Sequence, residues 1–230
     1  MKVLILNGSP KCEKSDTLHM SKAFAEGIRS VTGGDVRVIH TAEKRISYCN
    51  GCFICKKTGA CVIDDDMTKI LDAIRESDVV ILSFPLYCHS MPAALKVVVE
   101  RTMPLTAERI EKNGEGDYHH KEREETKDLR FVSICGSGYP HSRADFELIE
   151  KTVRRTFRGC DTVINVEESP LFNIKDAEPL TDPRLELLEK AGAEDAEAGT
   201  VSDDTYKQLA IPMIPEEIYM KFANGEKPGR

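Results

Sequence analysis

Short apolar runs rich in valine and isoleucine alternate along this chain with stretches whose apolar residues recur every three to four positions. The runs are Val3 to Leu6, Val36 to Ile39, Val79 to Phe84, Phe131 to Cys135 and Thr162 to Val166, each bounded by turn or polar residues. Continuous apolar runs of this length are typical of strands that are buried on both faces. The pattern therefore predicts five core strands.

The segments between these runs carry the period of an amphipathic helix. Their apolar faces are Met20, Phe24, Ile28 and Val31; Met67, Ile70, Leu71 and Ile74; Leu95, Val98, Val99 and Thr102; and Phe146, Ile149, Val153 and Phe157. Strands that alternate with helices form right-handed crossovers and a parallel sheet covered on both faces. We therefore predict an α/β fold with a doubly wound, flavodoxin-like five-stranded parallel sheet in the order 2-1-3-4-5.

Two segments depart from this alternation. Residues 106–128 are strongly charged and predict a solvated excursion before the fourth strand. From about Leu171 the pattern becomes helical with irregular linkers, and Asp182-Pro183 is expected to start a helix. We predict a flavodoxin-like domain over residues 1–170 and a C-terminal extension over 171–230 that packs on this domain or on a second subunit.

Composition and charge narrow the class of protein. A chain of 230 residues can bury a sizeable core without disulfides, and its formal net charge of −7 argues against a nucleic-acid partner. The sequence has no apolar stretch near the roughly 18 residues of a membrane span, and its first apolar run is too short for a signal peptide. We therefore expect a cytoplasmic protein with no membrane partner, whose eight cysteines are reduced, metal-bound or catalytic.

A dense cysteine motif is the strongest chemical signal, formed by Cys49, Cys52, Cys55 and Cys61. Such compressed spacing is typical of Fe–S ligand runs, and four thiolates suit an all-cysteine [4Fe–4S] cluster. Zinc fits less well because structural zinc usually takes two separated pairs of cysteines. Reduced thiols packed in a loop are the third alternative, and the sequence leaves the three open. Asp64, Asp65 and Asp66 are expected to cap the helix that begins near Met67, and their charge to lower the potential of any nearby cluster.

The first strand leads directly into a loop rich in hydroxyl side chains, after which the first helix begins. Ser9, Ser15 and Thr17 can donate hydrogen bonds there, and the unpaired N–H groups at a helix N-terminus attract phosphate. A nucleotide-binding P-loop does not fit, because Glu13 stands where that motif needs glycine. A simple capped turn is the alternative, but the density of hydroxyls favours phosphate binding.

Three motifs taken together resemble a known family. They are Gly8-Ser9-Pro10 with Ser15 and Thr17; Pro85-Leu86-Tyr87 with Ser90-Met91-Pro92-Ala93-Ala94-Leu95-Lys96; and the cysteine motif running on through Cys61-Val62-Ile63-Asp64-Asp65-Asp66-Met67. Over roughly residues 1–170 the chain is similar to the NAD(P)H-dependent FMN reductase and iron–sulfur flavoprotein group of the flavodoxin-like superfamily.

This resemblance implies where an FMN would lie. Its phosphate is expected on Ser9, Lys11, Ser15 and Thr17. Its ring is expected against Pro85, Leu86, Tyr87, Cys88 and His89, with the turn of Gly136, Ser137 and Gly138 on the other side. Aromatic and proline surfaces bury such a ring, and nearby backbone N–H groups stabilise the negative charge of reduced flavin. The cysteine motif follows the second strand and is therefore expected at the same edge of the sheet.

The function that the resemblance implies is FMN-dependent oxidoreduction, in which electrons pass from NAD(P)H to a small acceptor such as a flavin or a quinone. No catalytic side chain is required, because the flavin carries the chemistry. An iron–sulfur flavoprotein that passes electrons through a [4Fe–4S] cluster to a ferredoxin-type protein is the first alternative. A thiol-based redox sensor or a non-catalytic flavodoxin-like binding module is the second. The resemblance and the apolar C-terminal segment also predict a homo-oligomer.

Overall fold

The core of the protein is a five-stranded parallel sheet. The computed structural model describes residues 1–112, 114 and 116–226. The strands are β1 (Val3–Asn7), β2 (Val36–His40), β3 (Val79–Pro85), β6 (Arg130–Gly136) and β7 (Thr162–Val166). They pair in the order β2-β1-β3-β6-β7, which is 2-1-3-4-5 when the core strands alone are numbered. The predicted fold class and strand order are confirmed.

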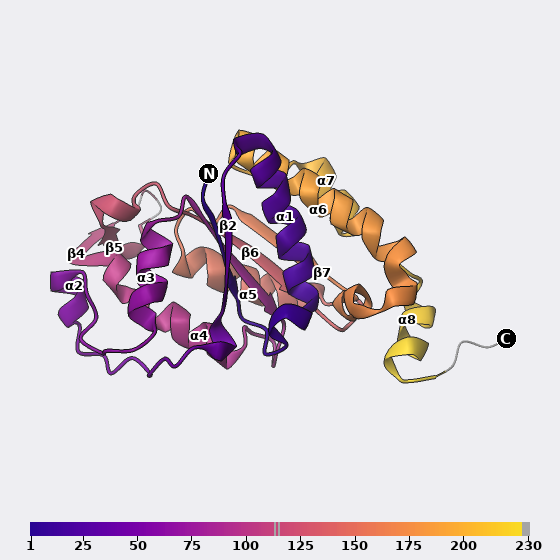
Figure 1. Cartoon of the computed structure of the whole chain (residues 1–230), viewed down its shortest axis with the longest axis horizontal. Coiled ribbons are helices and arrows are strands. Elements are labelled where there is room, and N and C mark those ends of the chain that lie inside the picture. The colour runs from indigo at the N-terminus through magenta and orange to yellow at the C-terminus, as the bar shows by residue number, and fades with distance from the viewer. Residues whose placement is uncertain (113, 115, 227–230) are drawn as a thin grey trace.

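Helices cover both faces of this sheet. The main ones are α1 (Asp16–Thr32), α3 (Met67–Arg75), α4 (Ala93–Glu100), α5 (Arg143–Thr156) and α6 (Glu178–Ala198). Helices α3, α4 and α5 pack on one face, and α1 and α6 pack on the other (Figure 1). Short 3₁₀ turns occupy Cys12–Lys14, Thr41–Glu43, Met103–Leu105, Glu124–Thr126, Ser169–Asn173 and Lys175–Ala177. Among the described residues, no helix is long and apolar enough to cross a membrane.

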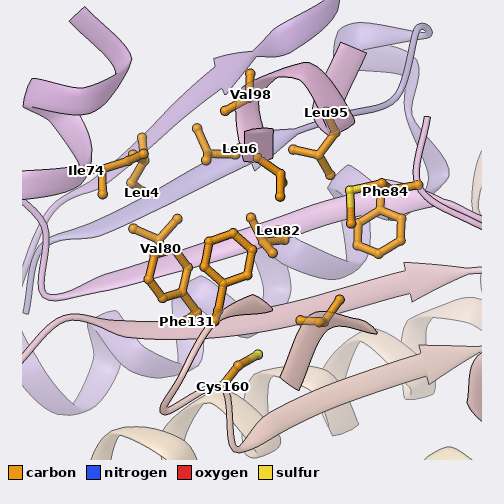
Figure 2. Close-up of a cluster of buried hydrophobic side chains, with 14 of the residues drawn as sticks. Leu4, Leu6, Ile74, Val80, Leu82, Phe84, Leu95, Val98, Phe131 and Cys160 are labelled. Atoms are coloured by element: carbon orange, nitrogen blue, oxygen red, sulfur yellow. The ribbon is translucent and has the colours of Figure 1, made fainter. Parts of the chain in front are cut away.

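Alternate residues of each strand enter opposite halves of the core. Leu4 and Leu6 of β1 join Val80 and Leu82 of β3 in the half covered by α3, α4 and α5 (Figure 2). Val3 and Ile5 point to the other side, toward α1 and α6. Both faces of the sheet are thus buried, which is why the strand sequences read as continuous apolar runs.

The charged segment before β6 folds into a hairpin. Strands β4 (Thr106–Lys112) and β5 (Tyr118–Glu122) pair antiparallel outside the main sheet. Figure 1 places this hairpin beside the short helix α2 (Ile54–Thr58), at the end of the molecule away from α6. Lys56 of α2 is buried and bonds to Thr106, and Arg123 donates to the Lys56 carbonyl at 2.7 Å. The predicted excursion is therefore an ordered support for the segment that carries the cysteines.

The C-terminal segment contributes α6 and two shorter helices, α7 (Asp203–Leu209) and α8 (Glu216–Ala223). Helix α6 begins at Glu178 and contains Pro183, so the expected helix start at Asp182-Pro183 is wrong. Pro179 already supplies a proline in the first turn, where its missing N–H has no helical partner to lose. Helix α6 lies along α1 (Figure 1), and the two backbones touch at Gly27 and Gly192.

Candidate functional site

The loop between β1 and α1 holds three buried hydroxyl side chains. Ser9, Ser15 and Thr17 are each at most 2% exposed. Ser15 is the N-cap of α1, where its Oγ accepts a hydrogen bond from the Leu18 N–H. The Oγ also lies 2.9 Å from Thr17 Oγ1. The hydrogen bond between these two hydroxyl groups uses only one of their two hydrogens. The other hydroxyl hydrogen can therefore be donated to an anion at the helix N-terminus.

Charged side chains of this loop are paired within the protein. Lys11 Nζ lies 2.8 Å from Asp16 Oδ2, and Glu13 bonds to Lys22 and to His40 Nε2 at 2.9 and 2.8 Å. Hydrogen bonds from Lys22 and then His40 lower the pKa of Glu13. Lys11, which the family resemblance places on a phosphate, contacts a carboxylate here, although its side chain is half-exposed and reaches the loop surface.

The segment after β3 forms a tight turn. Tyr87 and Ser90 exchange backbone hydrogen bonds of 2.8 and 2.9 Å, and Cys88 and His89 between them have φ angles of 49° and 59°. A left-handed backbone is uncommon for residues other than glycine and asparagine, and such strain is concentrated at functional sites. The Tyr87 side chain is exposed, so its ring is accessible to a flat ligand. His89 Nδ1 lies 2.6 Å from Asp145 Oδ1, which joins the turn to α5.

The turn after β6 touches both of these segments. The Leu86 N–H donates to the Gly136 carbonyl at 2.8 Å. A Cβ at Gly136 would lie 2.9 Å from Thr17 Cγ2 and 2.7 Å from Ser169 Cβ, so only glycine fits there without displacing a neighbour. Ser137 is buried beside it. The three segments that the sequence nominated therefore meet at the carboxyl edge of the sheet.

The C-terminal segment also reaches this site, which sequence reasoning did not foresee. Asn173 Nδ2 donates to the Lys14 carbonyl at 2.8 Å, just before α1 begins. Tyr219 of α8 is 1% exposed, and its hydroxyl donates to the Gly138 carbonyl at 2.7 Å. The local sequence gave no signal of either contact, because each joins residues far apart in the chain.

The four cysteines of the dense motif line one cavity of about 270 Å³. Cys55 is buried, Cys61 is partly buried, and Cys49 and Cys52 are exposed. Burial raises the pKa of the Cys55 thiol, and the other three sulfurs raise it further. Across residues 1–112, 114 and 116–226, no three metal-binding side chains converge on a single ion. An all-cysteine cluster takes four thiolates, each on a different iron, and four cysteines line this cavity.

A buried ion pair supports the cysteine cavity. Arg101, the residue that ends α4, is 2% exposed and contacts Asp65 Oδ2 at 2.8 Å. Its two terminal nitrogens also donate to the Ser47 carbonyl at 2.6 Å and to Cys61 Sγ at 3.4 Å. Burial favours the neutral forms of both partners, but the hydrogen bonds outweigh it: the pKa of Arg101 is raised and that of Asp65 is lowered.

The expected role of the aspartates needs correction. Asp66 is the N-cap residue of α3 but makes no side-chain capping bond. Asp65 caps instead, since its Oδ1 accepts from the Met67 N–H at 3.0 Å, while Arg101 donates to both of its carboxylate oxygens. Its negative charge is neutralised and does not act alone on the cavity. Arg101 was missed, although it follows Val98 by three residues on an apolar helix face, where a charge requires a partner.

Comparison with known proteins adds independent information. Over 105 residues the chain is 36% identical to an iron-sulfur flavoprotein of Methanocaldococcus jannaschii, a match that covers 46% of this chain and 53% of that protein. Over 104 residues it is 35% identical to an iron-sulfur flavoprotein of Archaeoglobus fulgidus, covering 45% and 46%. The chain thus matches about half the length of these relatives.

Solved structures share the fold at low sequence identity. An FMN-dependent NADH-azoreductase from Bacillus anthracis, in complex with FMN, aligns with a TM-score of 0.59 at 16% identity over 85% of this chain and 99% of that one. An NAD(P)H:quinone oxidoreductase from Methanothermobacter marburgensis aligns with a TM-score of 0.59 at 18% identity over 84% and 98%. Residues 1–128, more than half of the chain, match the family described as NADPH-dependent FMN reductase. The chain therefore belongs to the NADPH-dependent FMN reductase family.

Proposed function

We propose that this protein is an FMN-dependent oxidoreductase that passes electrons from NAD(P)H to a small acceptor such as a flavin or a quinone. The observation that carries the proposal is the meeting of three chain segments at Thr17, Leu86 and Gly136. Open α/β sheets bind ligands outside the carboxyl ends of their strands, where the strand order reverses. In this sheet the reversal lies between β1 and β3, which is where the three segments meet.

The first of these segments suits the phosphate of FMN. Ser9, Ser15 and Thr17 offer buried hydroxyls beside the N-terminus of α1, and a dianion there is favoured by the helix dipole and the unpaired N–H groups. Gly136 allows the β6 turn to approach Thr17 closely. Lys11 would give up or share its bond to Asp16 to contact the phosphate. The donor set therefore fits an anionic group.

The other two segments suit a flat ring. Pro85, Leu86 and the accessible Tyr87 offer apolar surface on one side, and the turn through Ser137 and Gly138 offers backbone groups on the other. Bound FMN would supply the hydride and electron chemistry. The chain's own part is to orient the ring, shield it from water and donate hydrogen bonds to it. The Cys88-His89 turn, strained and tied to Asp145, is placed to hold the edge of that surface.

Binding measurements with Thr17→Val test the phosphate assignment. Loss of one hydrogen bond to a charged phosphate should weaken FMN binding by about 1 to 2 kcal/mol, or roughly 5- to 30-fold. Riboflavin lacks the phosphate, so its affinity should stay the same. Thr32→Val is the matched control, because Thr32 lies at the far end of α1 and donates to the Ile28 carbonyl. Flavin fluorescence titrations of the three proteins give the affinities.

Two results would contradict the proposal. Equal FMN affinity in Thr17→Val and wild type would show that the phosphate lies elsewhere. Protein that binds FMN but is not bleached by NADH or NADPH under anaerobic conditions would exclude the pyridine-nucleotide reductase. If NADH or NADPH does reduce the protein, the proposed acceptors, a flavin or a quinone, can be ranked by the rate at which each reoxidises it.

One observation favours a second candidate function, an iron–sulfur flavoprotein that carries electrons to a ferredoxin-type protein. The four motif cysteines line a single cavity, and the sequence relatives are named iron-sulfur flavoproteins. In this case the cysteines would hold a [4Fe–4S] cluster. Anaerobically purified protein should then contain iron and show a brown absorption shoulder that Cys52→Ala removes while FMN is retained. Iron-free protein would exclude this candidate and leave the first one intact.

A further inference from the structure

Three arginines from three different elements hold the cysteine segment in place. Arg75 of α3 donates to the Gly59 carbonyl at 2.7 Å. Arg123, next to the β4–β5 hairpin, donates to the carbonyls of Cys55 and Lys56 at 3.2 and 2.7 Å. Arg101 at the end of α4 donates to the Ser47 carbonyl at 2.6 Å. Most of this segment lies outside regular secondary structure, so these guanidinium groups satisfy carbonyls that would otherwise need water or a ladder partner.

Among these three, Arg101 contacts a sulfur. Its Nη2 lies 3.4 Å from Cys61 Sγ, and the same guanidinium bonds to both carboxylate oxygens of Asp65 at 2.8 and 3.1 Å. The Arg101 and Asp65 side chains are 1% and 8% exposed. Removing two charges from water is costly unless their hydrogen bonds are complete. Within the described part of the chain, Arg101 Nε has no hydrogen-bond partner, so the hydrogen bonding of this buried guanidinium is incomplete.

A thiolate at Cys61 would supply additional negative charge beside the arginine. Metal ligation requires the thiolate form of cysteine, and an N–H donor to that sulfur stabilises it. Hydrogen bonds to the sulfurs and local charge are among the factors that set the potential of an iron–sulfur group. Gaining one electron makes such a group more negative, so a cationic donor at a ligand sulfur favours the reduced form.

We propose that Arg101 is a positioning residue that orients Cys61 toward a metal group in the cysteine cavity and raises the reduction potential of that group. The inference rests on the iron–sulfur alternative of the proposed function. Arg101 itself gains and loses no electron and forms no covalent bond: one electron enters the metal group and leaves it, while the guanidinium keeps its proton. Asp65 sets how much of the positive charge reaches the sulfur, since it contacts the same two nitrogens.

Variants at these two positions should shift the potential in opposite directions. Asp65→Asn removes the compensating carboxylate, so the potential should rise above that of the wild type. Arg101→Met in the Asp65→Asn background removes the cation without leaving a buried carboxylate unpaired. Its potential should fall below that of Asp65→Asn, by roughly tenfold in the one-electron equilibrium or about 59 mV. Arg75→Met is the matched control, because Arg75 anchors the Gly59 carbonyl and bonds to no sulfur.

The measurement is a dye-mediated redox titration of anaerobically purified protein, with dithionite as the reductant, followed by electron paramagnetic resonance of the reduced group. Iron and flavin are quantified in each sample, and circular dichroism reports folding. Loss of iron from the Arg101→Met/Asp65→Asn double variant, with iron retained in Asp65→Asn and Arg75→Met, would also support the positioning role. Equal potentials in Asp65→Asn and the double variant, or an equal shift in Arg75→Met, would overturn it.

A further variant covers the case in which the double variant does not fold. Arg101→Lys keeps the charge, but an ammonium cannot bond to Asp65, Ser47 and Cys61 with the planar fork of arginine. Its potential should lie below that of the wild type, and an unchanged potential would overturn the inference. Wild-type protein that contains FMN but no iron would refute the role of Arg101 while leaving the FMN reductase proposal standing.

Discussion

Helix α6 rests on α1 through direct backbone contact, and alanine at Gly192 tests that contact. A Cβ at Gly192 would lie 1.9 Å from the Phe24 carbonyl oxygen and 2.8 Å from its carbonyl carbon. At the reciprocal position, a Cβ at Gly27 would lie 1.9 Å from the Glu189 carbonyl oxygen. Backbone atoms cannot rotate away as the end of a side chain can. The two helices must therefore separate to admit the methyl group.

Two opposing contributions set the size of the effect. Alanine is better than glycine inside a helix by about 0.8 to 1 kcal/mol. Overpacking a closed contact costs typically about 1 to 3 kcal/mol, and separation also exposes Phe24, Ile28 and Leu188, which are buried at this helix pair, at about 25 cal/mol per Å². The costs of exposure and overpacking add up and exceed the gain in helix propensity, so we expect Gly192→Ala to lower the free energy of unfolding by about 2 kcal/mol. In a chain of this length that lowers Tm by roughly 4 to 8 °C.

Thermal unfolding followed by circular dichroism measures the difference. Gly114→Ala is the control, because a Cβ there meets no atom of the described residues within 4 Å, and its Tm should match the wild type. Gly27→Ala should lower Tm as Gly192→Ala does, and the double variant should lose less than the sum, since one separation of the helices relieves both clashes. A Gly192→Ala protein as stable as the wild type would refute the close approach of α1 and α6.

Two further predictions concern titratable groups. Hydrogen bonds from Arg101 and two backbone N–H groups lower the pKa of Asp65 in the folded state. The ionised Asp65 therefore stabilises the folded protein fully above its unfolded pKa of about 4, and this contribution is lost as the pH falls through the folded pKa. Asp65→Asn should therefore lower the free energy of unfolding at pH 7 by about 3 kcal/mol and flatten its decline below pH 5 in urea titrations; an unchanged acid limb would contradict this. Burial raises the pKa of Cys160 to about 12 and also raises that of Cys135, so neither thiol should react with a thiol reagent at pH 8 until the protein is unfolded. Labelled peptides are identified by mass spectrometry, and modification of Cys135 or Cys160 at the rate of the exposed Cys88 would contradict this prediction.

The core strands and helices were predictable because burial on both faces leaves a strong pattern. Strand β7 spans the predicted Thr162 to Val166, and α3 begins at the predicted Met67. The β4–β5 hairpin was not predictable, because Glu111 and His119 face each other across it without an apolar alternation. The hairpin is held in place by hydrogen bonds of Lys56 and Arg123 to partners that lie tens of residues away in the sequence.

For the candidate site, the sequence predicted which segments take part but not the contacts between them. The segments of Ser15, Tyr87 and Gly136 belong to the carboxyl ends of the first, third and fourth predicted strands, and the order 2-1-3-4-5 makes these strands neighbours, so the segments meet at one edge. The contacts of Tyr219 with Gly138 and of Asn173 with Lys14 had no local signal. A hydrogen bond between residues 81 positions apart depends on how the whole chain packs, not on the pattern around either residue.

The sequence by itself determined the core strands and helices, the hydroxyl-rich loop and the cysteine motif, because each follows from the periodicity or spacing of nearby residues, and the alternation of strands and helices indicated a known fold type with its strand order. Tertiary structure alone decided that α6 rests on α1 of the same chain, and that Arg101 is buried between Asp65 and Cys61. The physical reason is the range of the interactions. Apolar periodicity acts over one turn or one strand, whereas ion pairs and helix packing join residues that only the completed fold brings together.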